Sequence, residues 1–152
     1  MYRDESTVSS GDGDAPDAGS SSPDAQARRV LIVDDNRDSA ESLGALIELY
    51  GHQVAISHDG LDALDVARRF RPHIALLDLD LPRLSGYEVA ERLRAEAGTK
   101  TVLLVALTGY GGLEDKNESR ARGFDEHLTK PADFKRLFAL IAASPSQPDD
   151  ST

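Results

Sequence analysis

The stretch "VLIVDDN" (Val30–Asn36) joins a short apolar run to two acids, and it decides the class of fold. The run Val30–Val33 is continuous but too short for a helix, so it predicts a strand that is buried on both faces. Strands of this kind occur in parallel sheets that are covered by helices on both sides. Asp34 and Asp35 then mark the carboxyl end of the strand.

Downstream of Asn36, segments with helical spacing alternate regularly with short apolar runs. Further strands are expected at residues 53–57, 74–79, 102–107 and about 126–128. Helices are expected at about 38–50, 59–70, 86–95, 113–122 and 132–142, and the fourth of these is mostly polar. Five strand–helix repeats with short connections predict an α/β fold, a doubly wound five-stranded parallel sheet with helices on both faces.

The two ends of the chain have a different composition from the middle. Residues 1–27 are mostly Ser, Gly, Asp, Pro and Ala, with six acids against one arginine, and residues 144–152 carry two acids and no base. Segments with so few large apolar side chains cannot offset the entropy lost on ordering. We therefore expect a disordered acidic leader at 1–27, a folded domain at 28–143 and a disordered tail at 144–152, with most of the net charge of −10 in the two ends.

Several classes of function are disfavoured by composition. The chain has no cysteine, which excludes disulfides and thiolate metal sites, and no basic patch, which argues against nucleic-acid binding. The longest apolar run, Val102–Leu107, is far too short to span a membrane, and the N-terminus lacks the apolar stretch of a secretory signal. We expect a cytoplasmic protein without a membrane partner.

Polar residues stand where the predicted strands end, which is where open parallel sheets bind ligands. These residues are Asp34, Asp35, Asp78, Asp80, Thr108 and Lys130. Each pair of carboxylates about 4 Å apart repels by roughly 4 kcal/mol at an effective dielectric near 20, and a hard divalent cation removes this cost. An all-oxygen site with room for water favours Mg²⁺. One carboxylate can then attack a phosphoryl donor while the metal and Lys130 neutralise the transferring oxygens.

Four strings in this order and spacing, "VLIVDDN", "LLDLDLPRLSGYEV", "VALTGY" and "LTKP", resemble the receiver domains of bacterial response regulators. The resemblance covers residues 29–142 and implies a flavodoxin-like sheet of order 2-1-3-4-5. It also implies that Asp78 is the phosphoacceptor. Asp35 and Asp78 would bind Mg²⁺ directly, Asp34 would help through water, and the backbone carbonyl of Asp80 would complete the protein ligands.

The same resemblance assigns the remaining polar residues. Thr108 would hydrogen-bond the phosphoryl group, Lys130 would pair with Asp78 or its phosphate, and the Lys130–Pro131 bond would be cis. Most receivers have Tyr or Phe three residues before the lysine, where this chain has His127, so Thr108 and His127 are the candidate switch residues. Asp80 and Tyr110 occupy positions that tune the lifetime of the phosphate. Three other histidines are interpreted as surface or boundary residues: His52, His58 and His73.

The resemblance predicts a signalling protein that promotes only its own phosphotransfer and dephosphorylation. Its phosphodonor would be a histidine kinase or a histidine phosphotransfer protein. No effector pattern follows residue 143, so we expect a stand-alone receiver that acts on an unidentified protein target. A receiver segment of a hybrid histidine kinase is the nearest alternative. A haloacid-dehalogenase-like phosphatase is a remote one, since the acidic pair of this chain precedes Asp78 and no cap segment is visible.

Overall fold

The computed structural model describes residues 27–79, 81–109, 120–130 and 133–145. Its centre is a five-stranded parallel sheet of order β2-β1-β3-β4-β5. The strands are β1 (Arg29–Val33), β2 (Gln53–Ser57), β3 (Ile74–Asp78), β4 (Leu103–Thr108) and β5 (Glu126–Thr129). The helices are α2 (Arg37–Leu49), α3 (Gly60–Phe70), α4 (Gly86–Ala95) and α6 (Phe134–Ala143).

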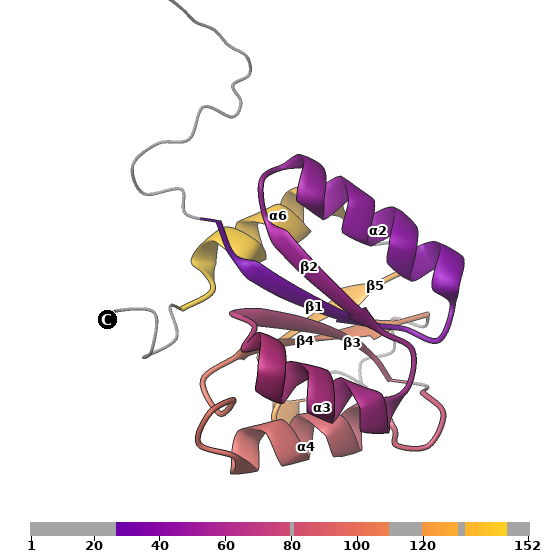
Figure 1. Ribbon diagram of the computed structural model, residues 1–152, viewed down its shortest axis with the longest axis vertical. Helices are drawn as coiled ribbons and strands as arrows, with labels where there is room; N and C mark the ends of the chain where they lie inside the picture. Colours follow the sequence, from indigo (N-terminus) through magenta and orange to yellow (C-terminus); the bar gives the residue numbers. More distant parts are fainter. Residues whose placement is uncertain (1–26, 80, 110–119, 131–132, 146–152) are drawn as a thin grey trace, which may run out of the picture.

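Helices cover both faces of the sheet, as Figure 1 shows: α2 and α6 lie on one side, and α3 and α4 lie on the other. Side chains alternate between the two faces along β1, because successive residues of a strand point in opposite directions. Leu31 and Val33 belong to the core under α3 and α4, whereas Val30 and Ile32 belong to the core under α2 and α6. This two-sided burial explains why the first strand reads as a continuous apolar run.

Local sequence sets where the helices begin. Asn36, Asp59 and Asp133 are the N-caps of α2, α3 and α6, and the side chain of each accepts a backbone N–H of the first turn. Ser85 caps α4 in a reciprocal capping box with Glu88. These caps place four helix starts at the carboxyl edge of the sheet, next to the strand ends.

The predicted fold class is confirmed, including the strand order 2-1-3-4-5. The second strand and the third helix, α4, have the predicted bounds; β4 begins and ends one residue later than predicted, and β3 ends one residue earlier. The first helix begins at Arg37 because its cap is Asn36. Most of the predicted 113–122 helix and the start of the predicted 132–142 helix lie outside the described residues.

The boundaries predicted for the folded domain stay predictions, because residues 1–26 and 146–152 lie outside the described part of the chain. Ser144, the C-cap of α6, is buried, and its hydroxyl accepts a hydrogen bond from Nε of Arg28 at 3.2 Å. This contact joins the residue before β1 to the residue that ends α6. Every helix in the described ranges is too short or too polar to span a bilayer.

Candidate functional site

The carboxyl edge of the sheet brings acids from two neighbouring strands together. β1 and β3 pair directly, with Val33 opposite Leu77, and the strand order reverses between them. Asp34 follows β1 and Asp78 ends β3, so both lie at this edge. Carboxylate oxygens of Asp34, Asp35 and Asp78 lie within 4.8 Å of one another; the first and third residues are buried, and Asp35 is exposed. The structure thus groups three residues that are 44 positions apart in sequence at the extremes.

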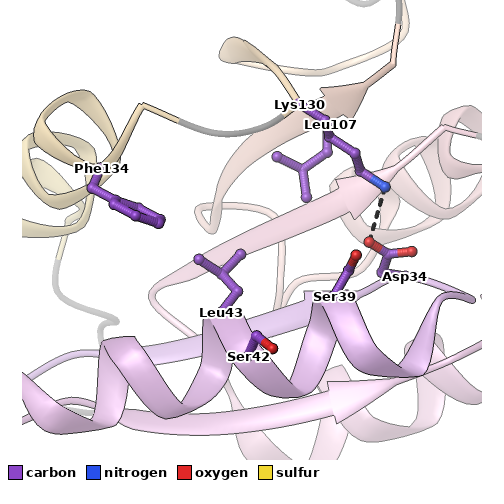
Figure 2. A pocket seen from close by; sticks show the side chains of 7 residues that line it. All are labelled: Asp34, Ser39, Ser42, Leu43, Leu107, Lys130 and Phe134. Atoms are coloured by element: carbon purple, nitrogen blue, oxygen red, sulfur yellow. Dashed lines mark hydrogen bonds and ion pairs between the residues drawn. The ribbon is translucent and has the colours of Figure 1, made fainter.

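Lys130 bridges two of these acids. Its Nζ donates to Oδ2 of Asp34 at 2.9 Å and to Oδ2 of Asp78 at 3.1 Å. Lys130 directly follows β5, and its backbone N–H donates to the carbonyl of Thr108 at the end of β4 at 2.8 Å. The ammonium therefore reaches the acids from the β5 side of the sheet, and Figure 2 shows it pointing at Asp34.

The charge of Lys130 is set by two opposing effects. Burial of the ammonium is the largest single influence and on its own lowers the pKa of Lys130. The hydrogen bonds that the ammonium donates to Asp34 and Asp78, together with the negative charges of these acids, outweigh it, so the pKa of Lys130 is raised above its ordinary value. Lys130 is therefore a cation at neutral pH. One ammonium thus faces three clustered acids in the contacts of the described residues.

Asp34 is anchored through its backbone and its carboxylate. Its N–H donates to the carbonyl of Ser57 at 3.0 Å, and its own carbonyl lies 2.9 Å from Nδ1 of His58. Its Oδ1 accepts the backbone N–H of Asn36 at 2.9 Å, while Oδ2 faces Lys130. The residue as a whole is only 2% exposed. Neighbouring strands and the following turn together fix the position of this acid.

Gly86, the first residue of α4, packs against the backbone at the end of β3. Its N–H donates to the carbonyl of Leu79 at 3.1 Å. A Cβ at position 86 would lie 2.4 Å from the carbonyl oxygen of Asp78 and 2.9 Å from Cα of Leu79. Any larger residue would have to displace one of these backbones. The start of α4 therefore packs directly against Asp78, the last residue of β3, and Leu79, which follows it.

The two predicted switch residues lie on adjacent strands. Thr108 ends β4 and His127 lies within β5, opposite Ala106, and both are buried, at 6% and 8% exposure. Thr108 belongs to the carboxyl edge that carries the acids, whereas His127 lies two register positions further from it. Other predicted site features lie outside the described residues: Asp80, Tyr110 and the Lys130–Pro131 bond.

Sequence reasoning missed two contacts of the site. His58 is partly buried, as the surface-or-boundary interpretation allows, but the contact of its ring with the backbone of Asp34 was not predicted. The same interpretation was wrong for His73, which is buried. Asn36 was not singled out, although it caps α2 and also bonds the carboxylate of Asp34. The available signal was position: His58 directly follows the second strand and therefore stands at the same sheet edge as the acids.

A pocket of about 450 Å³ opens beside the bridging lysine, between α2 and α6. Asp34 and Lys130 form its charged end, and the side chains of Leu43, Leu107 and Phe134 form an apolar wall, as Figure 2 shows. Two hydroxyls on α2 complete the lining: Ser39 and Ser42. The site thus has an open approach from the α2 side of the sheet.

The chemistry of the donor set fits a small divalent cation. All three clustered side chains offer oxygen, which Mg²⁺ prefers, and Mg²⁺ binds oxygens at about 2.0–2.1 Å. Oxygens that already lie within 4.8 Å of one another need to move only slightly to share such an ion. The exposed Asp35 leaves one side open to water, which suits an ion that keeps several of its own waters.

Comparison with known sequences gives a family. The response regulator receiver domain family matches residues 30–142. Protein PilH of Pseudomonas aeruginosa is 33% identical over 115 residues, which is 76% of this chain and 95% of PilH. RpaA of Synechocystis sp., a DNA-binding dual master transcriptional regulator, is 32% identical over 115 residues. The chain spans only 48% of RpaA, and about half the length of several other curated relatives.

Comparison with solved structures agrees. The receiver domain of the sensor histidine kinase PA1611 from Pseudomonas aeruginosa, solved with a magnesium ion in its active-site cleft, has a TM-score of 0.71 and 27% identity. That match covers 78% of this chain and 98% of the PA1611 domain. Because the family match spans most of the chain, and the strand order and the similarity to PilH agree with it, this chain belongs to the response regulator receiver domains of two-component signalling.

Proposed function

We propose that Asp78 is the phosphoacceptor of this receiver, and that its phosphorylation changes how the protein binds a partner protein. The phosphodonor is a phosphohistidine, on a histidine kinase or a histidine phosphotransfer protein. A carboxylate oxygen of Asp78 attacks phosphorus, the phosphorus–nitrogen bond breaks, and the imidazole nitrogen keeps the electron pair and takes up a proton. The product is an acyl phosphate on Asp78. The chain acts only on its own phosphoryl group, in the cytoplasm, where ATP supplies such donors.

The position of Asp78 carries this proposal. It ends the central strand of the sheet, is 9% exposed, and has a cation 3.1 Å from Oδ2. The two other acids of the site are held close to it, and Lys130 contacts Asp34 as well as Asp78. A nucleophilic carboxylate needs neighbours that neutralise the incoming phosphoryl oxygens, and this edge of the sheet provides them.

A bound Mg²⁺ supplies charge neutralisation for the three transferring oxygens. The residues that would hold it are Asp34, Asp35 and Asp78, with the backbone carbonyl of Asp80 as a further ligand that lies outside the described residues. Lys130, whose Nζ already contacts Oδ2 of Asp78, would pair with the product phosphate. The magnesium in the PA1611 receiver supports this arrangement.

Thr108 and His127 connect the phosphoryl group to the partner-binding surface in this proposal. A phosphoryl group adds about −1.5 to −2 of charge and three acceptor oxygens. Moving a population from 1:99 to 99:1 takes about 5.5 kcal/mol. Two charge-assisted hydrogen bonds, from Thr108 and Lys130, contribute about 1.5–3 kcal/mol each, so together they reach this free energy only at the upper end of that range. Thr108→Ala should therefore accept phosphate but lose the phosphate-dependent gain in partner affinity.

A phosphorelay is the second candidate function, and the likeness to a receiver from a sensor histidine kinase favours it. In a relay the acyl phosphate of Asp78 passes on to a histidine instead of changing a binding surface. The haloacid-dehalogenase-like alternative lacks such support, because the family match over residues 30–142 is to receivers. Transfer of the phosphoryl group from Asp78 to a phosphotransfer protein in vitro would favour the relay.

The test is intact-protein mass spectrometry after incubation with acetyl phosphate, with and without Mg²⁺. We expect wild type to gain one phosphoryl group only with Mg²⁺, and Asp78→Asn to gain none. Asp65→Asn is the matched control, because Asp65 is an exposed residue of α3 that pairs only with Arg69 in the described contacts, and it should behave as wild type.

The proposal would be overturned by a wild-type protein that folds normally, stays unmodified with acetyl phosphate and phosphoramidate, and does not bind beryllofluoride. Beryllofluoride mimics the phosphoryl group without being hydrolysed. Its binding to an apparently unmodified wild type would instead support the site and indicate rapid loss of phosphate.

A further inference from the structure

The last residue of β2 and the residue that follows it hold the backbone of Asp34 on both sides. The N–H of Asp34 donates to the carbonyl of Ser57, and the carbonyl of Asp34 lies 2.9 Å from Nδ1 of His58. A carbonyl oxygen only accepts, so Nδ1 of His58 carries the proton and donates it. One side chain of the β2–α3 turn thus fixes the carbonyl that separates the two adjacent acids of the site.

The orientation of that carbonyl determines the position of the Asp35 backbone. The carbonyl of Asp34 and the N–H of Asp35 belong to one planar peptide unit, so a bond to one end orients the whole plane. Asp34 and Asp78 are additionally fixed by Lys130 and by burial, whereas Asp35 is the exposed member of the three. The orientation of Asp35 therefore depends strongly on the peptide plane before it. Asp34 and Asp78 depend less on their backbone, because Lys130 and burial also hold their side chains.

We propose that His58 is a positioning residue for the divalent cation: by hydrogen-bonding the Asp34–Asp35 peptide, it holds the carboxylate of Asp35 in place as a ligand. This inference rests on the proposed function of the same site. Partners of metal ligands that lie one bond further out commonly change metal affinity by about 10–100-fold when they are removed, although the ligands themselves stay. His58 has this relationship to the acid pair through the backbone.

Direct ligation by His58 is a poorer explanation of the contact. Nδ1 carries a proton and faces a carbonyl, so its lone pair is not available to a metal. In the described ranges, the groups whose ligand atoms lie within 4.8 Å of one another are Asp34, Asp35 and Asp78, and the His58 ring is not among them. The ring acts on the backbone of the ligands.

Two substitutions of nearly equal shape separate the hydrogen bond from the volume of the side chain. His58→Asn keeps an N–H donor on the atom that branches from Cγ where Nδ1 does. His58→Leu has the same branching but no donor. Binding of Mn²⁺ followed by electron paramagnetic resonance, and of Mg²⁺ by calorimetry, reports affinity without any phosphorylation. Both are measured at one fixed pH of about 8 for all variants.

We expect His58→Leu to raise the dissociation constant for the cation about tenfold, and His58→Asn to stay within about twofold of wild type. Phosphorylation by acetyl phosphate should show the same split: His58→Leu needs about tenfold more Mg²⁺ to reach half of its maximal rate, and that maximal rate stays close to wild type. Asp35→Asn, which loses a ligand, sets the scale for full disruption. Circular dichroism checks folding, and His58→Ala replaces His58→Leu if the leucine variant does not fold.

Equal cation affinity in the leucine and asparagine variants, whether both match wild type or both are weak, would overturn the positioning role and leave the phosphoacceptor proposal intact. A wild type that binds neither cation would overturn the proposed metal site, and the role of His58 with it. Near-wild-type cation affinity in His58→Asn, together with weakened affinity in His58→Leu, supports the inference. A side chain that only filled space would give the two variants the same affinity.

Discussion

A Cβ on residue 86 would lie 2.4 Å from the backbone carbonyl oxygen of Asp78, so Gly86 is in direct contact with the strand that carries the proposed phosphoacceptor. The same glycine is the first residue of α4 and donates its N–H to the carbonyl of Leu79. The start of α4 therefore packs directly against the end of β3. A change in the position of one backbone has to move the other.

Gly86→Ala should lower both the stability and the phosphorylation rate. The added methyl group forces the start of α4 away from β3, and over-packing of this kind costs about 1–3 kcal/mol of unfolding free energy. Urea unfolding measures the first effect and mass spectrometry after incubation with acetyl phosphate measures the second. Gly98→Ala is the control, since a Cβ there would meet nothing nearer than the Arg71 guanidinium at 3.9 Å. Equal effects of the two substitutions would contradict the prediction.

Much of this architecture is visible in the sequence because strand burial and strand order constrain it. The apolar runs of β1 and β3 predict two-sided burial, and the carboxyl-edge rule then groups the acids that follow them. The contact of His58 with Asp34 depends on the register of β2 against β1, in which Ser57 lies opposite Val33. No short-range pattern encodes that register, so a residue that acts through it looks like an ordinary turn residue.

Boundaries were less predictable than elements for a related reason. The predicted fourth strand began at Val102, but the N–H of Val102 closes a turn onto the carbonyl of Thr99, and β4 starts one residue later. Val102 and Leu103 are both apolar, so hydropathy does not distinguish the turn from the strand. Hydrogen bonding decides the boundary, and the apolar pattern carries no information on it.

Lys130→Met should destabilise the protein at neutral pH. The substitution leaves the carboxylates of Asp34 and Asp78 without the ammonium that lies 2.9 and 3.1 Å from them. Because the lysine is partly exposed, we expect a loss of about 1–2 kcal/mol, between the values typical of exposed and buried pairs. Urea unfolding in the absence of divalent cations measures it. Lys135→Met on the exposed side of α6 is the control and should change the unfolding free energy by less than about 0.5 kcal/mol.

The same variant predicts a pH dependence. The pKa of Lys130 is raised above its ordinary value of 10.5 in the folded protein, since its bonds to Asp34 and Asp78 outweigh the effect of burial. Its stabilising contribution is therefore complete below 10.5 and is lost as the pH rises through the folded pKa. The stability difference between wild type and Lys130→Met should be constant up to that range and then shrink. A difference that grows with alkaline pH would contradict this assignment.

Arg83→Gly should stabilise the protein. Arg83 has a φ of 75°, in the left-handed region, where a side chain costs about 1–2 kcal/mol and glycine costs nothing. Glycine also increases the entropy of the unfolded chain, which lowers stability by about 0.5–1 kcal/mol. We therefore expect a net gain of about 0.5–1 kcal/mol in the free energy of unfolding, measured with urea. The ion pair that is lost, Arg83 to Asp59 at 3.9 Å, is largely exposed and contributes little.

Arg92→Gly is the matched control for Arg83→Gly, because it makes the same chemical change inside α4. Glycine costs about 1 kcal/mol in a helix interior, so this variant should lose stability while the other gains it. A gain in the free energy of unfolding for Arg83→Gly together with a loss for Arg92→Gly would show that the gain comes from the backbone conformation at position 83. A loss in both variants would show that the side chain of Arg83 matters more than its strained φ.

His52→Asn should make the stability of the protein less sensitive to mild acid. Nδ1 of His52 accepts the backbone N–H of Arg28 at 3.0 Å, at the entry to β1. Burial, and secondarily the positive charge of Arg28, lower the pKa of His52 below its ordinary value of 6.5. The unfolded chain therefore binds this proton more readily, so stability that is present above 6.5 is lost as the pH falls through the folded pKa. The asparagine Oδ1 takes the place of Nδ1 as acceptor and does not titrate, so the free energy of unfolding should fall less steeply between about pH 7.5 and pH 5.5 than in wild type.

His52→Leu, which removes the acceptor, should instead lose about 1 kcal/mol already at neutral pH. Parallel pH profiles for wild type and His52→Asn would exclude His52 as a source of acid sensitivity and shift attention to the other titrating groups of the fold.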